Sequence, residues 1–175
     1  VQSGIRRALD DRSLGSGTAI NAALLAAAAY LRQQPERGRR AILLVTDNVA
    51  LNYQTPDKAV IRELYRADAV LNTILIGKQV HPDPVKPGQY QNPDFTQPDC
   101  FKITAETGGE FFEARKSRNA FAAMVDHLRA RYALHYEAPP DGGDAFHRIR
   151  VELVPAAADR YRGAVLRARA GYYAR

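Results

Sequence analysis

The chain has little cysteine: Cys100 is the single one among 175 residues. One cysteine cannot form a disulfide within the chain, and no second cysteine or histidine lies near it at the spacing of metal ligands. A disulfide framework and a metal site built on this thiol are therefore excluded. We expect Cys100 to be a small, half-buried side chain that serves packing.

Long apolar runs are also missing. A membrane span requires roughly 18 apolar residues, and the longest candidate, AINAALLAAAAYL, has 13 and is rich in alanine. It therefore predicts a buried helix and no membrane span. The first residues, VQSGIRRALDD, lack the charged-then-apolar layout of a signal peptide. They also lack methionine, so we expect the natural chain to begin upstream of Val1.

Charge of one sign is not concentrated anywhere. The net charge is +6, from 25 basic and 19 acidic residues, and among the scattered arginines only ERGRR at 36–40 forms a cluster. Nucleic-acid binding requires a basic face with aromatic stacking partners. We expect a solvated surface and no nucleic-acid partner. The hydrophobic content of 46% is ordinary for one soluble domain.

Helical and extended patterns alternate along the chain. Apolar periodicity and capping signals predict helices at 2–11, 18–34, 55–68, 100–107 and 117–132, and continuous apolar runs predict strands at 41–46, 69–77 and 110–114. This order predicts an α/β fold, a Rossmann-like doubly wound sheet flanked by helices. On the last helix, we expect Phe121, Met124, Val125 and Leu128 to point inward.

The last part of the chain changes period. Apolar and polar residues alternate in 132–139, 146–154 and 164–174, which predicts strands with one solvated face. We therefore expect an α/β domain over 1–136 and an antiparallel β extension over 137–175, packed on the same domain.

Two oxygen-bearing side chains are expected at the ligand-binding edge of this sheet. Asp47 ends the strand at 41–46, and ligands of such sheets bind at the carboxyl ends of the strands. Thr18 opens the first long helix after Gly15 and Gly17. A hydroxyl and a carboxylate are hard donors that suit Mg²⁺, Mn²⁺ or Ca²⁺. The alternatives are a plain helix cap for Thr18 and a turn residue for Asp47.

The segments GSGTAINAAL, AILLVTDN and ITAETGGEFFEA, in this order, resemble the von Willebrand factor A domain. The ending, RYALHYEAPPDGGDAFHRIRVELV followed by LRARAGYYA, is similar to the bacterial subgroup first described in Acidobacteria. The resemblance covers nearly the whole chain. It implies a Rossmann-like sheet with a divalent cation at its top, in the metal-ion-dependent adhesion site.

The resemblance also implies roles for individual residues. Thr18 matches the family's threonine ligand, and Asp47 matches the later aspartate, which usually reaches the cation through water. The family usually has glycine where this chain has Asn48, and its Asp-x-Ser-x-Ser motif is absent. The chain therefore resembles the carboxyl-terminal two-thirds of such a domain. We expect Mg²⁺, or Mn²⁺ or Ca²⁺, to bind when the upstream motif is present.

The function implied is noncatalytic protein binding, in adhesion or assembly, with an acidic side chain of the partner on the metal. The family and the single cysteine favour a location outside the cytoplasm. A structural assembly module with a degenerate, metal-free site is the alternative. An enzyme is disfavoured, because GSGT lacks the lysine of a phosphate-binding loop and the four histidines have no partners at catalytic spacing.

Two further surfaces are predicted to meet partners. Without the family's first strand, residues Ala41–Val45 would form an open apolar edge, along which a segment or a neighbouring subunit would pair. The proline-rich stretch 78–99 has no secondary-structure pattern and starts at the binding edge. We expect its Tyr90 and Phe95 to anchor a partner, with packing on the domain's own surface as the alternative.

Overall fold

The computed structural model describes residues 18–35, 38–50, 52–77, 82, 86–90, 92, 95–116, 119–137 and 145–173, with only the backbone at 52–53 and 95–96. The helices are α2 (Ile20–Gln33), α3 (Asp57–Arg66), α4 (Cys100–Glu106), α5 (Ala120–Arg129) and α6 (Pro155–Arg160). The strands are β1 (Arg40–Thr46), β2 (Asn52–Tyr53), β3 (Ala69–Leu75), β4 (Phe95–Thr96), β5 (Phe111–Glu113), β6 (Phe146–Arg148) and β7 (Gly171–Tyr173). The helix predicted at 2–11 lies outside the described residues.

A parallel sheet in the order β1-β3-β5 forms the centre of the molecule. β1 and β3 pair over their whole length, from Arg40 opposite Ala69 to Thr46 opposite Leu75, and β5 pairs with the last part of β3. The α/β fold predicted from the alternating pattern is confirmed. β1 lies at an edge, and among the described residues β3 is its one neighbour in the sheet.

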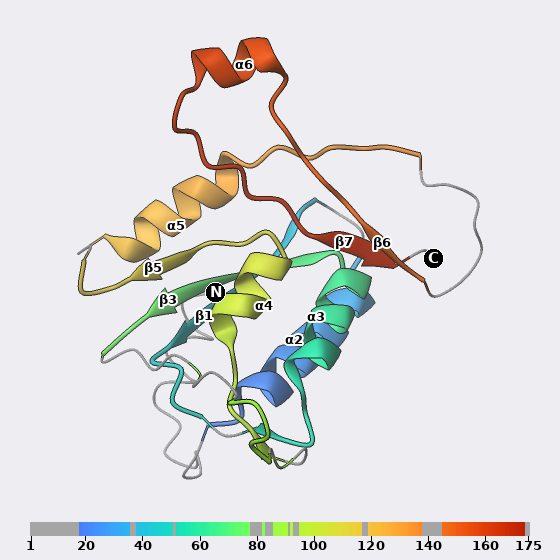
Figure 1. Ribbon diagram of the computed structural model, residues 1–175, viewed down its shortest axis with the longest axis vertical. Coiled ribbons are helices and arrows are strands. Elements are labelled where there is room, and N and C mark those ends of the chain that lie inside the picture. The colour runs from blue at the N-terminus through green and yellow to red at the C-terminus, as the bar shows by residue number, and fades with distance from the viewer. Residues whose placement is uncertain are drawn as a thin grey trace.

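Helices cover both faces of this sheet, and Figure 1 shows the strands between α5 on one side and α2 and α3 on the other. On the first face, Leu24 and Leu64 pack against Leu71 of β3. On the opposite face, Met124 of α5 packs against Ile74. Each buried side chain of this size contributes about 1.5–3 kcal/mol. These two apolar layers hold the three-layer arrangement together.

The helices follow from their sequences, with shifts at their ends. α2 is alanine-rich, and Ile20, Leu24 and Ala28 recur every four residues on its buried face. It begins two residues after Thr18, the predicted start, and ends before Pro35. The end of α4 is as predicted: Gly108 has a φ of 74°, and the N–H of Gly109 bonds to the carbonyl of Thr104 at 2.8 Å.

One inward residue of α5 was predicted wrongly. Met124 is fully buried, and Leu128 packs half-buried beside it, but Phe121 is 61% exposed. The inner face of the helix is centred on Ala120, Met124 and Leu128. Phe121 follows Ala120 directly, so it lies about 100° around the helix from that face.

The carboxyl-terminal extension contains less strand than its alternating sequence predicts. β6 and β7 form an antiparallel pair of three residues each. The described parts of 132–139, 149–154 and 164–170 are not strands, and Pro155–Arg160 forms α6, which was not predicted. Alternation produces a strand only where a sheet covers the apolar side, and Val151, Val154 and Val165 are exposed.

Aromatic contacts attach the extension to the α/β core. The ring centroids of Tyr65 and Phe146 lie 5.6 Å apart, and those of Phe146 and Tyr173 lie 5.3 Å apart. The guanidinium of Arg62 lies 5.7 Å from the Tyr173 ring centroid. The pair β6–β7 therefore packs on α3, whereas α6 stands away from the sheet at the far end of the extension (Figure 1).

Candidate functional site

The carboxyl ends of β1 and β3 form the expected binding edge, called here the rim, with Asp47, Asn48 and Gly77. The N–H of Ile76 bonds to the carbonyl of Thr46 at 2.9 Å, so the two strands remain paired up to the rim. Gly77 has a φ of 60°, and a Cβ built on it would lie 4.0 Å from the Cβ of Asp47. The backbone after β3 therefore approaches Asp47 closely.

Asp47 sits in a fixed turn. Its Oδ1 accepts a hydrogen bond from the N–H of Val49 at 3.0 Å, and the N–H of Asn48 donates to Thr46 Oγ1 at 3.0 Å. Asn48 is fully buried, has a φ of 63°, and donates from Nδ2 to the carbonyl of Pro98 at 3.1 Å. The interpretation of Asp47 as a turn residue therefore agrees with its local bonds, in which Oδ1 is an acceptor within the turn.

Thr18 is exposed and lies just before α2. The cap position of α2 belongs to Ala19, and no side chain makes a capping bond there. The reading of Thr18 as a plain helix cap is therefore wrong. No hydrogen bond joins Thr18 to Asp47 in the described part of the chain, and both stand on the side of the sheet where strands end and helices begin.

A polar network at the starts of three helices was not predicted from the sequence. Asn21 Nδ2 donates to Asp57 Oδ1 at 2.7 Å and to the carbonyl of Thr55 at 2.8 Å. The N–H of Asp99 donates to Asp57 Oδ2 at 3.2 Å. Asp99 in turn caps α4, since its Oδ1 accepts from the N–H of Lys102 at 2.9 Å. Asp57 thus joins the starts of α2, α3 and α4 beside the rim.

The charge of Asp57 is costly in this position. Burial raises its pKa, the hydrogen bond from Asn21 lowers it, and the nearby Asp99 carboxylate raises it, with a net rise above the ordinary 3.8. The signal that could have revealed part of the network is Asp99 before Cys100, a common helix cap. The link from Asn21 to Asp57 spans 36 residues, and local patterns carry no trace of it.

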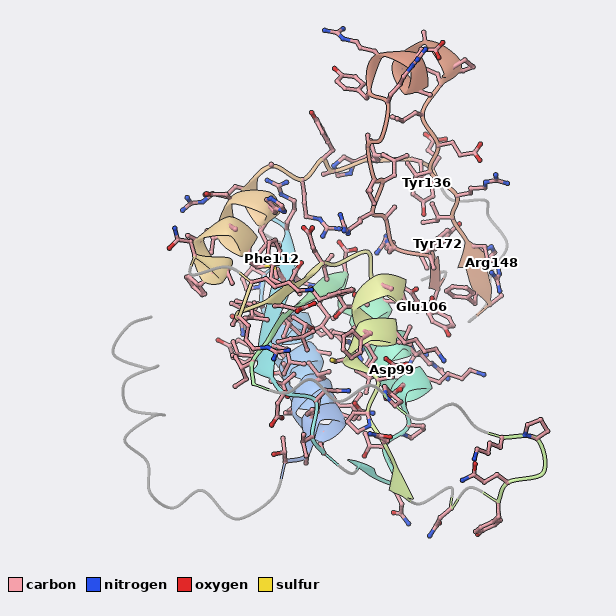
Figure 2. All side chains as sticks on the ribbon, turned by 60° about the vertical axis from the view of Figure 1, so that its left-hand side comes forward. Asp99, Glu106, Phe112, Tyr136, Arg148 and Tyr172 are labelled. Atoms are coloured by element: carbon pink, nitrogen blue, oxygen red, sulfur yellow. The ribbon has the colours of Figure 1, made fainter. Side chains whose placement is uncertain are left out.

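Of the two predicted partner anchors, only Tyr90 has a side chain among the described residues. Tyr90 is 83% exposed, which agrees with an exposed anchor. Phe95 is in β4, which pairs with β2, and its side chain lies outside the described residues. The stretch 78–99 therefore contains one short strand, contrary to the prediction that it has no secondary structure. Figure 2 shows Asp99 and Glu106 near opposite ends of α4, and the rim lies on the Asp99 side.

The cysteine and one histidine differ from expectation. Cys100 is fully buried, not half-buried, and burial, with a further contribution from Asp99, raises its pKa to about 12. His127 Nδ1 lies 2.7 Å from Oε2 of Glu110, the residue just before β5, so this histidine does have a carboxylate partner. Among the described residues, no three His, Cys, Asp or Glu side chains are grouped so that they could hold a metal ion.

No protein-family model, curated protein or solved structure matches the chain. The resemblance to the von Willebrand factor A domain therefore rests on the sequence segments themselves. None of the helices that the structure describes is long and apolar enough to cross a membrane.

Proposed function

We propose that this chain is a noncatalytic protein-binding domain, used in adhesion or assembly, whose partner is held through a divalent cation at the rim. Thr18 is a direct ligand of the cation, and Asp47 reaches it through water. The partner completes the coordination with an acidic side chain. The resemblance supplies these roles, and it favours a location outside the cytoplasm.

The observation that carries the proposal is the turn at Asp47 and Asn48. Asn48 stands where the family usually has glycine, and its φ of 63° is a conformation that glycine and asparagine adopt most readily. Asparagine here retains the backbone path of a glycine, and it ties that path to Pro98 by a buried bond. The replacement is therefore compatible with a rim that presents Asp47 as the family does.

The ligands named in this chain are too few for tight binding. Thr18 and Asp47 offer two oxygen donors, whereas Mg²⁺ takes about six in octahedral geometry. The family's Asp-x-Ser-x-Ser segment would supply the rest. We therefore expect the 175 residues alone to bind Mg²⁺ or Mn²⁺ weakly, with the remaining positions filled by water.

A metal-free assembly module is the second candidate, and the edge strand β1 favours it. Val45 is 54% exposed and Ala41 is exposed, whereas Leu71, Thr73 and Leu75 of the neighbouring β3 are buried. An apolar edge strand is a template for another strand. In this reading, a segment or a neighbouring subunit pairs along Ala41–Val45, and Asp47 serves only the turn.

The exposed Tyr90 is proposed as an anchor for the same partner. Aromatic side chains are frequent among the residues that dominate binding energy, and 83% exposure leaves Tyr90 available. Phe95, five positions after Tyr90 and at the start of β4, is the second proposed anchor. Replacing Tyr90 with Ala should weaken binding of the partner while leaving the thermal midpoint unchanged.

Acetate is a probe for the open coordination position, because it carries the carboxylate that the partner would supply. Backbone amide resonances are followed by NMR during an acetate titration, once with Mg²⁺ and once with EDTA. We expect acetate to shift the amides of Thr18, Asp47 and Asn48 only when Mg²⁺ is present. Asp47→Asn should abolish these shifts, since it keeps an oxygen for the turn but removes the charge.

Asp159→Asn is the matched control, because it removes one exposed carboxylate on α6, away from the rim. It should leave the acetate shifts unchanged. Shifts that are equal with Mg²⁺ and with EDTA, or that persist in Asp47→Asn, would contradict the cation-dependent site. If a segment or a neighbouring subunit still paired along β1 after such a result, the metal-free module would be favoured.

A further inference from the structure

The chain between β6 and α6 has the alternating sequence of a strand, but over most of its length no strand lies beside it. We call residues 148–154 the open segment. The last backbone bond between the two arms of the extension runs from the N–H of Ile149 to the carbonyl of Ala170, at 2.9 Å. Residues 150–153 make no backbone hydrogen bond to another described residue. Figure 1 shows the chain running almost straight from β6 to α6. The open segment therefore presents unpaired backbone groups.

The other arm of the extension, which leads into β7, is a poor partner for the open segment. β6 and β7 pair with Arg148 opposite Gly171. Continued by two residues, the same register would place Arg150 directly opposite Arg169. Like charges directly opposite each other destabilise an antiparallel pair. The two arms therefore separate at the point where this repulsion would begin.

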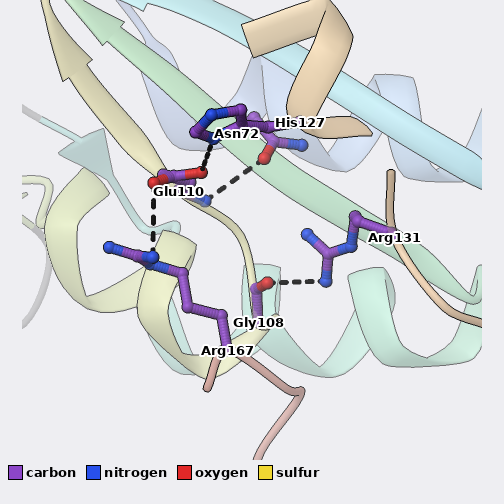
Figure 3. A network of polar contacts seen from close by, with 6 residues as sticks. All are labelled: Asn72, Gly108, Glu110, His127, Arg131 and Arg167. Atoms are coloured by element: carbon purple, nitrogen blue, oxygen red, sulfur yellow. Dashed lines mark hydrogen bonds and ion pairs between the residues drawn. The ribbon is translucent and has the colours of Figure 1, made fainter. Parts of the chain in front are cut away.

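Contacts with the α/β core hold that other arm in its place. Arg169 Nη1 lies 2.5 Å from Asp68 Oδ1. Arg167 Nη1 lies 3.3 Å from Glu110 Oε1, and Figure 3 shows Arg167 reaching Glu110 from the carboxyl-terminal segment. Pairing of the two arms beyond Ile149 would break both ion pairs and would bring two arginines together. The open segment is therefore left without a partner from this arm.

The edge of β6 that faces away from β7 is also open. Because the N–H of Ile149 bonds to the β7 arm, odd-numbered residues of an extended segment direct their backbone groups toward that arm. Even-numbered residues then direct theirs to the opposite edge. The sheet of β6 and β7 has two strands among the described residues, so Arg148, Arg150 and Glu152 meet no strand there. The side chains of Arg150 and Glu152 form an ion pair and are 86% and 62% exposed.

The open segment is complementary to a second copy of itself. When two copies are laid antiparallel about Val151, Arg150 of each lies opposite Glu152 of the other, so opposite charges meet twice. The same register places Ile149 opposite Leu153 twice and the two Val151 residues opposite each other. Opposite-charge and apolar cross-strand pairs stabilise antiparallel strands. The second copy thus offers the charge match that the chain's own arm lacks.

We propose that two copies of this chain pair antiparallel along the open segment and form a two-fold symmetric dimer. The two-stranded sheets of both copies then join into one four-stranded sheet, in the order β7-β6-β6-β7. An isolated two-stranded sheet is marginally stable, whereas three or more strands with an apolar face are stable. Ile149, Val151 and Leu153 of both copies form that face. This interface is separate from the rim and from β1, so it does not rest on the function proposed above.

Charge reversal in the full chain tests the pairing between copies. Arg150→Glu gives each open segment two carboxylates, and Glu152→Arg gives each two guanidinium groups, so either variant meets like charges in its own dimer. Sedimentation equilibrium should show that each variant raises the dissociation constant of the dimer by about tenfold or more. An equimolar mixture of the two variants should restore a dimer as tight as the natural one, because unlike segments then meet. Pairing within one chain cannot produce this restoration.

Arg162→Glu is the matched control, because it reverses an equal charge at an exposed position after α6, and it should leave the dimer unchanged. Hydrogen exchange adds a second measurement: the amides of Arg150 and Glu152 should be protected in the dimer and should exchange fast on dilution. Amides that stay protected in the monomer would assign this edge to another part of the same chain. That result would overturn the proposal, as would a chain that stays monomeric at its highest soluble concentration, or a mixture no tighter than the single variants.

Discussion

Replacing Asp57 with Ala removes the carboxylate that joins the starts of α2, α3 and α4. Two hydrogen bonds to this carboxylate are lost, from Asn21 Nδ2 at 2.7 Å and from the N–H of Asp99 at 3.2 Å. Each bond to a charged group contributes about 1.5–3 kcal/mol, and burial of the charge offsets part of the sum. Asn21 keeps its bond to Thr55. We expect the free energy of unfolding to fall by about 2–4 kcal/mol.

The loss of unfolding free energy caused by Asp57→Ala should become larger as the pH falls. Burial and the Asp99 carboxylate raise the pKa of Asp57 above 3.8 despite the opposing bond from Asn21. Between the unfolded-state and folded-state pKa values, the folded protein binds more protons than the unfolded chain. The natural protein therefore gains stability from Asp57 as the pH falls through the folded-state pKa. The Ala variant lacks this gain, so the difference between the two proteins should be larger in acid.

Urea unfolding followed by circular dichroism, at neutral pH and just above pH 3.8, measures both quantities. Asp159→Ala removes an exposed carboxylate and serves as the control, with a change below about 0.5 kcal/mol. The reasoning is refuted if Asp57→Ala costs no more than this control, or if its cost shrinks on acidification.

Two further substitutions and one reactivity measurement have expected outcomes. Gly109→Ala places a Cβ 1.7 Å from the carbonyl oxygen of Leu71. Scanning calorimetry should therefore show a loss of stability above about 2 kcal/mol, against about 1 kcal/mol for the unobstructed Gly163→Ala. Equal losses would contradict the close packing of Gly109 against β3. The pKa of Cys100 is about 12, against an ordinary 9.0, so its thiolate should be roughly a thousandfold less populated than that of a free cysteine. A thiol reagent should therefore modify the folded protein slowly. Fast modification would disprove the burial of Cys100. Val45→Lys puts a charge on the exposed edge strand, so sedimentation should show less self-association with the fold retained, and unchanged association would remove β1 as the pairing edge.

The sequence predicted the elements whose signals are local. The apolar runs at 41–46 and 69–77 form β1 and β3, and Gly108 ends α4 as expected. Both features depend on the residue types at those positions: continuous apolar residues for the strands, and a glycine for the left-handed backbone that ends the helix. The described parts of the alternating segments after residue 132 are mostly not strands. An alternating pattern forms a strand only where another layer packs against its apolar side, and the pattern itself does not show whether such a layer is present. α6 formed instead at Pro155 and three alanines, which start and extend a helix well.

The candidate site was predictable in position but not in detail. Asp47 follows a continuous apolar strand, and that local fact places it at the rim. The network of Asn21, Asp57 and Asp99 and the pair of Glu110 with His127 depend on how helices pack across the sheet. These residues are 17 to 42 positions apart, too far for any local spacing rule to join them.

Paramagnetic relaxation by Mn²⁺ tests the central claim most directly, because it locates even a weakly bound cation. Mn²⁺ is added to the full chain at low concentration, and the broadening of each backbone amide is recorded. The account predicts the strongest broadening at Thr18, Asp47 and Gly77, lost in Asp47→Asn and retained in Asp159→Asn. Broadening centred on other carboxylates, or unchanged in Asp47→Asn, would show that the rim holds no cation.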